Sequence, residues 1–176
     1  MRVPTLEQVR RLPTSASVTV GAERIDGNDH LSVHHVVELA AHGAHELLVG
    51  CGLTDERRSR TGKGVFTAEH HLAYLHEVRQ GARLTVHTRI LDRSERAVLM
   101  AAFVVDQSRM RTASLLRTVV VSVDLSTRRS VPFPDDVAGA LDRLLEEHAA
   151  LPWDAPEPGW GALRHSSHSD ESKTQI

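Results

Sequence analysis

The stretch from Ile25 to Ser32, IDGNDHLS, gathers polar side chains that could form a catalytic site. Asp26 could attack a substrate or deprotonate a water molecule, Asn28 could orient either one, and His30 could hydrogen-bond Asp26. The same residue types also favour turns and helix N-termini. A purely structural loop is therefore the alternative interpretation, and the residues alone leave both open.

A long amphipathic helix is expected directly after this stretch. Ser32 is the expected N-cap, Gly50 and Gly52 are expected to end the helix, and Gly43 should permit a close approach by another backbone. The apolar residues recur at steps of three and four, which is typical of a helix that buries one face: Val33, Val36, Val37, Ala40, Ala44, Leu47 and Leu48.

The first turn of that helix could complete a catalytic site. Backbone N–H groups at a helix N-terminus are unpaired and carry the positive end of the helix dipole. Those from Val33 to His35 could therefore stabilise a negatively charged oxygen, while Asp26 supplies the carboxylate.

Histidines on the same helix raise the question of a metal. His34, Glu38, His42 and His45 stand at steps of four, four and three, so they share one helix face that could bind a metal ion. A polar face against a dimer partner or a substrate cavity is the simpler account, because no other ligands stand at motif spacing. The nearest candidates follow on a predicted strand, Glu69, His70 and His71. We expect no metal and no cofactor.

The rest of the chain is predicted to be mostly β-structure. A first strand is expected from Ser17 to Ile25, and a charged loop, TDERRSRTGKG, follows the long helix. An amphipathic helix is expected at about Asp135 to His148. Between them, β-type runs joined by short turns predict four antiparallel strands, Val65–Glu77, Arg83–Leu91, Ala97–Asp106 and Ser114–Leu125. The predicted class is α+β, with an antiparallel sheet wrapped around the long helix.

Length and composition favour one domain acting on a small molecule or a protein. The 176 residues predict a single domain over residues 1–150, with a core at about 17–136 and a disordered tail at 151–176. The 21 basic residues nearly balance the 23 acidic ones, so no nucleic-acid or membrane partner is expected. The single cysteine, Cys51, excludes an internal disulfide and is expected to be packed. The expected location is cytoplasmic, since the N-terminus does not resemble a signal peptide.

The motif and the order of elements resemble the hotdog-fold acyl-CoA thioesterases of the 4-hydroxybenzoyl-CoA thioesterase type. The family pattern after the first strand is often Asp-x-Asn-Gly-His-x-Asn, and Asp26, Asn28 and His30 match it. Asp29 stands where glycine is usual, and Ser32 stands where asparagine is usual. The resemblance extends over about residues 18–136, including the segments GVFTAEHHLAYLHEVRQGARLTVHTRIL and STRRSVPFPDDV.

This resemblance implies an enzyme that hydrolyses an acyl-CoA thioester to a free acid and CoA. It implies a homodimer, or two such dimers assembled into a homotetramer, with active sites at the subunit interface. The carboxylate aligned with Asp26 serves such enzymes as nucleophile or general base, and Glu38 is the helix carboxylate that could take its place. Substrate contacts are expected from the helix N-terminus, from one of two residues on the following strand, and from two arginines facing the CoA phosphates: Ser32, Val33, His34, His35; Glu69, His71; Arg128, Arg129.

Two other functions fit the same resemblance. A hotdog hydratase or dehydratase would use a histidine and an acid to move a proton at carbon. A non-catalytic protein could retain the acyl-CoA cavity without turnover, and the departures at Asp29 and Ser32 keep this alternative open.

Overall fold

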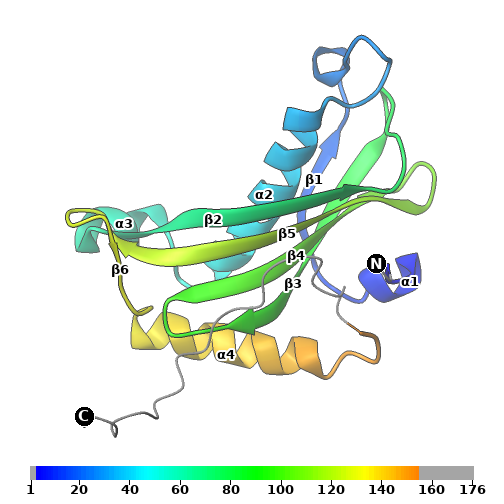
Figure 1. Ribbon diagram of the computed structural model, residues 1–176. Helices are drawn as coiled ribbons and strands as arrows, with labels where there is room; N and C mark the ends of the chain where they lie inside the picture. The colour runs from blue at the N-terminus through cyan, green and yellow to red at the C-terminus, as the bar shows by residue number, and fades with distance from the viewer. Residues whose placement is uncertain (1–2, 155–176) are drawn as a thin grey trace, which may run out of the picture.

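A curled antiparallel sheet wraps around one long helix, α2, in the computed structural model of the chain, which describes residues 3–154 (Figure 1). The elements before the main strands are α1 (Leu6–Val9), β1 (Thr14–Thr19), the 3-10 helix η1 (Ala22–Arg24), α2 (Val33–Gly50) and α3 (Asp55–Thr61). They are followed by β2 (Lys63–Tyr74), β3 (Arg83–Arg93), β4 (Ala97–Asp106), β5 (Arg111–Asp124), β6 (Arg129–Ser130) and α4 (Asp135–Ala149). This is the α+β hotdog arrangement that the sequence predicted.

The strand order places two strands at the edges of the sheet. The order is β1-β3-β4-β5-β2, every pair is antiparallel, and the short β6 pairs with β5. Within residues 3–154, strand β2 therefore has one unpaired edge over its 12 residues. Its pairing with β5 is interrupted between Thr67 and Glu69, where Ala68 forms a one-residue bulge.

The two faces of the sheet bury two different sets of side chains, because successive residues of a strand point to opposite sides. We call the side that packs on α2 the helix face and the opposite side the outer face. The helix face buries Val98, Met100, Ala102 and Val104 of β4 against α2. The outer face buries Ala101, Phe103, Val105 and Leu115 against Val9, Leu12 and Trp153.

Helix α2 lies close against β1 and β3 because Gly43 has no side chain. A Cβ atom at this position would lie 2.4 Å from Cγ1 of Val86 and 2.9 Å from Oγ of Ser15. Val86 is fully buried and cannot move aside without disturbing the core. The close backbone approach predicted from the sequence is confirmed.

The end of α4 is joined to β3 by an arginine and a histidine. His148 is buried and its Nδ1 accepts the backbone N–H of Ile90 at 2.9 Å. Arg89 donates to the carbonyl oxygens of His148 (2.6 Å) and Trp153 (3.1 Å), and its guanidinium lies 4.2 Å from the centre of the Trp153 ring. Burial lowers the pKa of His148, which keeps the imidazole neutral and able to accept.

Three local predictions differ from the structure. The first strand ends at Thr19, well before Ile25, because the chain turns at Gly21 into η1. The charged loop contains helix α3, where Thr54 accepts the N–H of Arg57 at 3.1 Å and Gly62 ends the helix with φ 64°. Acidic residues in its first turn and basic ones in its last match the helix dipole, so the signals for a helix were present. Neither α1 nor β6 was expected.

The structure describes only the beginning of the predicted tail. Trp153 is buried and its ring centre lies 5.9 Å from that of Phe103. The remainder of the predicted tail, residues 155–176, lies outside the described residues. Cys51 is buried, and burial raises the pKa of its thiol, in keeping with a packed cysteine. None of the helices within residues 3–154 has the length and apolar character needed to cross a membrane.

The contact at Gly43 predicts a specific cost of adding one methyl group. We expect Gly43→Ala to lower the free energy of unfolding by about 1–3 kcal/mol, because the buried Val86 must shift. Gly50→Ala, at the end of the same helix, is the matched control, since a Cβ there meets nothing within 4 Å. It should be neutral or stabilising by up to about 1 kcal/mol. Urea unfolding of both variants measures the difference, and equal effects would contradict this account of the helix position.

Candidate functional site

The Asp26 loop is a closed turn in which the carboxylate accepts two backbone hydrogen bonds. Oδ1 of Asp26 accepts the N–H groups of Asn28 (2.9 Å) and His30 (3.2 Å), and the N–H of Asp26 donates to the carbonyl of His30 at 2.8 Å. The bonds from Asn28 and His30, in that order, lower the pKa of Asp26. Asp26 is thus held in its ionised form. Asp29 adopts a positive φ of 61°, which explains why glycine is usual there and why aspartate is tolerated.

The imidazole of His30 pairs with a glutamate that the sequence analysis did not consider. Its Nε2 lies 2.7 Å from Oε2 of Glu77, whereas the hydrogen bonds between His30 and Asp26 use the backbone N–H and carbonyl of His30. Glu77 lies in the connection between β2 and β3. In the same connection, the carbonyl of Val78 accepts the N–H of Leu31 at 2.8 Å. The loop before α2 is therefore fixed to the β2–β3 connection by a side-chain pair and a backbone bond.

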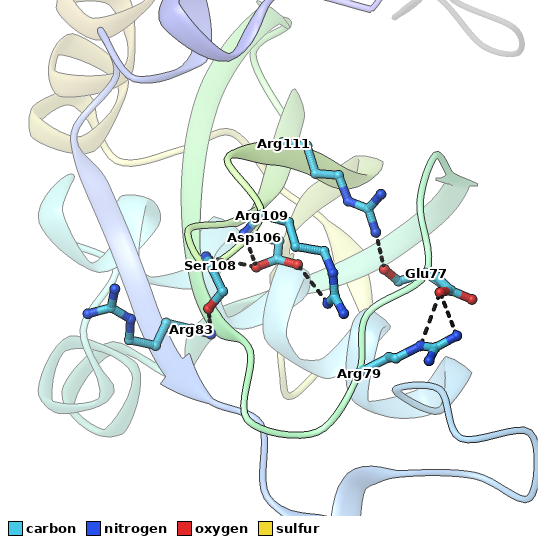
Figure 2. A network of polar contacts seen from close by, with 7 residues as sticks. All are labelled: Glu77, Arg79, Arg83, Asp106, Ser108, Arg109 and Arg111. Atoms are coloured by element: carbon cyan, nitrogen blue, oxygen red, sulfur yellow. Dashed lines mark hydrogen bonds and ion pairs between the residues drawn. The ribbon is translucent and has the colours of Figure 1, made fainter.

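Two arginines donate hydrogen bonds to Glu77 (Figure 2). Arg79 donates to Oε1 of Glu77 through Nε (3.1 Å) and Nη2 (3.0 Å), and Arg111 donates to its backbone carbonyl at 2.9 Å. Partial burial would raise the pKa of Glu77, but the charge of Arg79 and the bond from His30 lower it overall. In the adjacent β4–β5 turn, the buried Asp106 accepts the N–H groups of Ser108 (2.9 Å) and Arg109 (3.1 Å). The contacts of Arg79 and Arg111 with Glu77 thus hold the β2–β3 connection in place.

A pocket of about 310 Å³ opens between the Asp26 loop, the first turn of α2 and the end of β2. Its polar lining is Asp26, His30, Tyr74, His76, Glu77 and Ser114. Its apolar lining is Leu31, Val33, Val36, Val78, Val104 and Ala113. The pocket therefore combines an ionised carboxylate with an apolar floor.

The N-terminus of α2 borders this pocket without a side-chain cap. Ser32 occupies the N-cap position, but its Oγ lies 3.2 Å from Nδ1 of His34 and bonds no backbone N–H of the helix. The N–H of His35 donates to the carbonyl of Ser32 at 3.1 Å. Within residues 3–154, no acceptor is found for the backbone N–H groups of Val33 and His34. The free donors at the helix start are therefore these two, one fewer than the sequence suggested.

Glu38 and the histidine face of α2 lie outside this pocket. Glu38 is exposed and accepts from Nδ1 of His35 at 3.1 Å, and this hydrogen bond lowers the pKa of Glu38. His42 lies 3.7 Å from Glu46 on the next turns. The part of the chain that the structure describes contains no group of three or more histidine, cysteine or acidic residues that could hold a metal ion.

Two other sets of predicted site residues lie away from Asp26. Glu69 and His71 are paired with Val119 and Arg117 on the outer face, contrary to the expectation that one of them lines the same cavity. The bulge at Ala68 is the physical reason, because one extra residue reverses the alternation along β2. Arg128 and Arg129 follow the C-terminal end of β5, whereas the pocket residue Ser114 lies near the start of that strand.

Tyr74, His76 and Glu77 are the pocket residues that the sequence analysis missed. The predicted strand ran to Glu77, but β2 ends at Tyr74 and the next residues turn back over the pocket. Tyr74 is the single tyrosine of the chain and is 54% exposed. A lone tyrosine at a strand end near a run of histidines was the available signal. Partial burial raises the pKa of its phenol, so the hydroxyl stays protonated at neutral pH.

Comparison with known proteins agrees with this fold. Residues 20–141 match the thioesterase-like superfamily. The chain is 31% identical to a betainyl-CoA thioesterase of Pseudomonas aeruginosa, over 79% of this chain and 87% of that protein. It is 29% identical to an L-carnitine dehydrogenase/betainyl-CoA thioesterase of Agrobacterium fabrum, over 73% of this chain but only 26% of that longer protein.

A solved structure supports the fold independently of close sequence similarity. A hypothetical protein from Staphylococcus aureus, determined in complex with CoA, superposes with a TM-score of 0.75 at 20% identity. The match covers 88% of this chain and 94% of the other. The chain therefore belongs to the thioesterase-like superfamily, which confirms both the hotdog fold and the thioester hydrolase class expected from its sequence.

Proposed function

We propose that the pocket beside Asp26 hydrolyses an acyl-CoA thioester. The observation that carries the proposal is that the ionised carboxylate of Asp26 and the first residue of α2, Val33, line the same pocket, and that the N–H groups of Val33 and of His34 next to it have no acceptor within residues 3–154. Asp26 either removes a proton from an attacking water or attacks the thioester carbonyl itself, and the N–H groups stabilise the oxyanion. The C–S bond then breaks, and the CoA thiolate takes up a proton. Attack by water gives the free acid directly, whereas attack by Asp26 gives a mixed anhydride that a water molecule hydrolyses to the free acid and the Asp26 carboxylate.

His30 and Asn28 act as positioning residues in this proposal. Their backbone N–H groups fix the Asp26 carboxylate, and the imidazole of His30 joins the loop to Glu77. A carboxylate held by backbone bonds needs little reorganisation when charge moves from it to the substrate. Glu38 is the second candidate for the acid, although it lies outside the pocket of a single chain.

A homodimer formed by pairing of two β2 strands would complete this site. The unpaired edge of β2 can accept another strand, and an antiparallel, two-fold pairing places the start of one β2 toward the end of the other. The guanidinium of Arg128 lies 5.6 Å from the ring centre of Phe66 in β2, and Arg129 is paired with Asp124 of β5, which is itself paired with Lys63 at the start of β2. In such a dimer they would approach the Tyr74 end of the second copy, where they could bind CoA phosphates. Two dimers could then form a tetramer.

Asp26→Asn is the direct test of the catalytic assignment. An amide oxygen can still accept the N–H groups of Asn28 and His30, so the melting temperature should stay near that of the wild type. Release of free CoA should fall by roughly 10²-fold or more, because an amide neither attacks the carbonyl nor accepts a proton. A panel of short, long, branched, aromatic and charged acyl-CoAs with a thiol reagent measures this. Asp29→Asn is the matched control and should retain activity, since its side chain does not line the pocket.

The other outcomes of this experiment assign the function elsewhere. Unchanged turnover in Asp26→Asn would move the acid to Glu38. A rise in melting temperature with acyl-CoA but no thiol release would identify a non-catalytic binding protein. Formation or loss of a double bond with the thioester intact would identify a hydratase or dehydratase.

The lowered pKa of Asp26 predicts the acid side of the pH profile. Asp26 works in its ionised form, and its pKa lies below the ordinary value of 3.8. Activity that depends on this carboxylate should therefore be constant down to about pH 5 and should fall only as the pH drops below 3.8. Measurements of kcat/KM from pH 4 to pH 9 test this. A loss of activity on acidification centred near pH 6.5 would instead indicate an essential neutral histidine.

The lining of the pocket favours a short acyl group with a positive charge. Asp26 and Glu77 place two carboxylates at the pocket, Tyr74 adds one aromatic ring, and the floor is apolar. A quaternary ammonium group interacts favourably with such a combination, because its charge is spread over methyl groups that also bury well. The betainyl-CoA thioesterase at 31% identity supports the same substrate class.

A pair of substrates separates charge from shape. Betainyl-CoA carries a trimethylammonium group, and 3,3-dimethylbutanoyl-CoA has the same shape with a carbon in place of nitrogen. We expect kcat/KM to be higher for betainyl-CoA, and Tyr74→Leu to reduce that preference by roughly 2- to 30-fold, the range of one cation–π contact. Tyr74→Phe keeps the ring and should retain the preference. Equal kcat/KM for both substrates in the wild type would contradict selection of a cationic acyl group.

A further inference from the structure

A row of side chains crosses the outer face of the sheet, on the side opposite to α2. Strand pairing aligns Arg89 of β3 with Ala101 of β4, Ala101 with Arg117 of β5, and Arg117 with His71 of β2. Ala101 packs in the outer-face cluster, so the whole row points away from the Asp26 pocket. Two arginines of the same face are thus separated by one small residue.

The two arginines differ in how their charge is satisfied. Arg89 donates to two carbonyl oxygens and stacks on Trp153. Arg117 is only 4% exposed, and its Nε and Nη1 are buried without any hydrogen-bond partner in the part of the chain that the structure describes. No acidic residue of this part forms an ion pair with it. A buried guanidinium without an acceptor is unfavourable in free energy, and burial accordingly lowers the pKa of Arg117.

Arg117 lines a pocket of about 480 Å³ beside the edge strand β2. The other side chains that matter are Glu69 and His71 of β2, with Leu99 and Val119 as apolar walls. The packed residues Val9, Leu12 and Trp153 cover the Phe103 part of the outer face, and they do not line this pocket. The pocket therefore has the volume for a ligand beside a guanidinium that lacks acceptors for two of its nitrogens, Nε and Nη1.

We propose that this outer-face pocket binds an oxyanion, the carboxylate or phosphate group of a small molecule, on the guanidinium of Arg117. A planar guanidinium donates two parallel N–H bonds to such a group, and a charge-assisted pair satisfies donors that the protein leaves free. His71 lies across the strand pair and can donate a further bond. The site is separate from the thioesterase site, because Asp26 and the start of α2 lie on the helix face.

Glu69 is the feature of the pocket that opposes an anion. It is paired with Val119, two residues from Arg117 along β5, so it is a diagonal neighbour of the guanidinium on the same face. Its carboxylate is exposed and forms no ion pair with Arg117. Removal of this charge should strengthen anion binding. Glu69 therefore supplies a second variant with an effect opposite to that of removing Arg117.

Thermal unfolding of the full chain with sodium phosphate or sodium acetate, against sodium chloride at equal ionic strength, tests the proposal. For the wild type we expect a saturable rise of roughly 2–4 °C with phosphate or acetate. Arg117→Met should abolish this rise and should melt higher than the wild type in chloride alone, because an unpaired buried charge is replaced by an apolar side chain. Glu69→Gln should show the same rise at a lower anion concentration. Arg60→Met, an exposed arginine of α3, controls for net charge and should respond like the wild type.

Three results would overturn the proposal. The first is an anion response in Arg117→Met equal to that of the wild type. The second is a loss of the response in Arg60→Met, which would indicate non-specific charge screening. The third is no response of the wild type to either anion. If Arg117→Met and Glu69→Gln then also destabilise the protein equally, Glu69 is the internal counter-charge of Arg117.

Discussion

The close packing of α2 against β1 and β3 determines where the candidate site lies. Gly43 lets the helix axis approach Val86 and Ser15 more closely than any side chain would permit. A helix of 18 residues is rigid along its length, so this contact near its middle also sets the position of its first turn. The start of α2 at Val33 therefore lines the same pocket as Asp26. The position of α2 thus links the packing of the core at Gly43 to the geometry of the candidate site.

The second determinant of the site is the connection between β2 and β3. Asp26 is fixed by its own loop, but that loop is fixed by Glu77 and Val78 through His30 and Leu31. Arg79 and Arg111 hold the connection in turn (Figure 2). The carboxylate therefore keeps its orientation through contacts from segments about 50 residues apart in the sequence. Loops that carry function commonly depend on such support from the scaffold.

The elements with strong periodicity could be predicted from the sequence, and so could the turn at Asp26. The apolar steps of α2, the gap at Gly43 and the turn residues at Asp26 are local signals that the fold preserves. The faces of β2 could not be predicted, because one bulge at Ala68 reverses the alternation on which such an argument rests. The role of Glu77 depended on where β2 ends, and strand ends are set by tertiary contacts more than by residue type. The burial of Arg117 could not be predicted, because it depends on neighbours from other strands and not on the local sequence of β5.

The bulge at Ala68 also bears on how the chain avoids aggregation. A strand of 12 residues with one unpaired edge offers backbone donors and acceptors to any extended peptide it meets. A bulge bends the strand and breaks the regular spacing of those groups, so a straight foreign strand can match only one half of the edge at a time. A strand with the same irregularity at the complementary position would not suffer this mismatch. The bulge in β2 thus disfavours pairing with a regular foreign strand and still permits pairing with the β2 strand of a second copy.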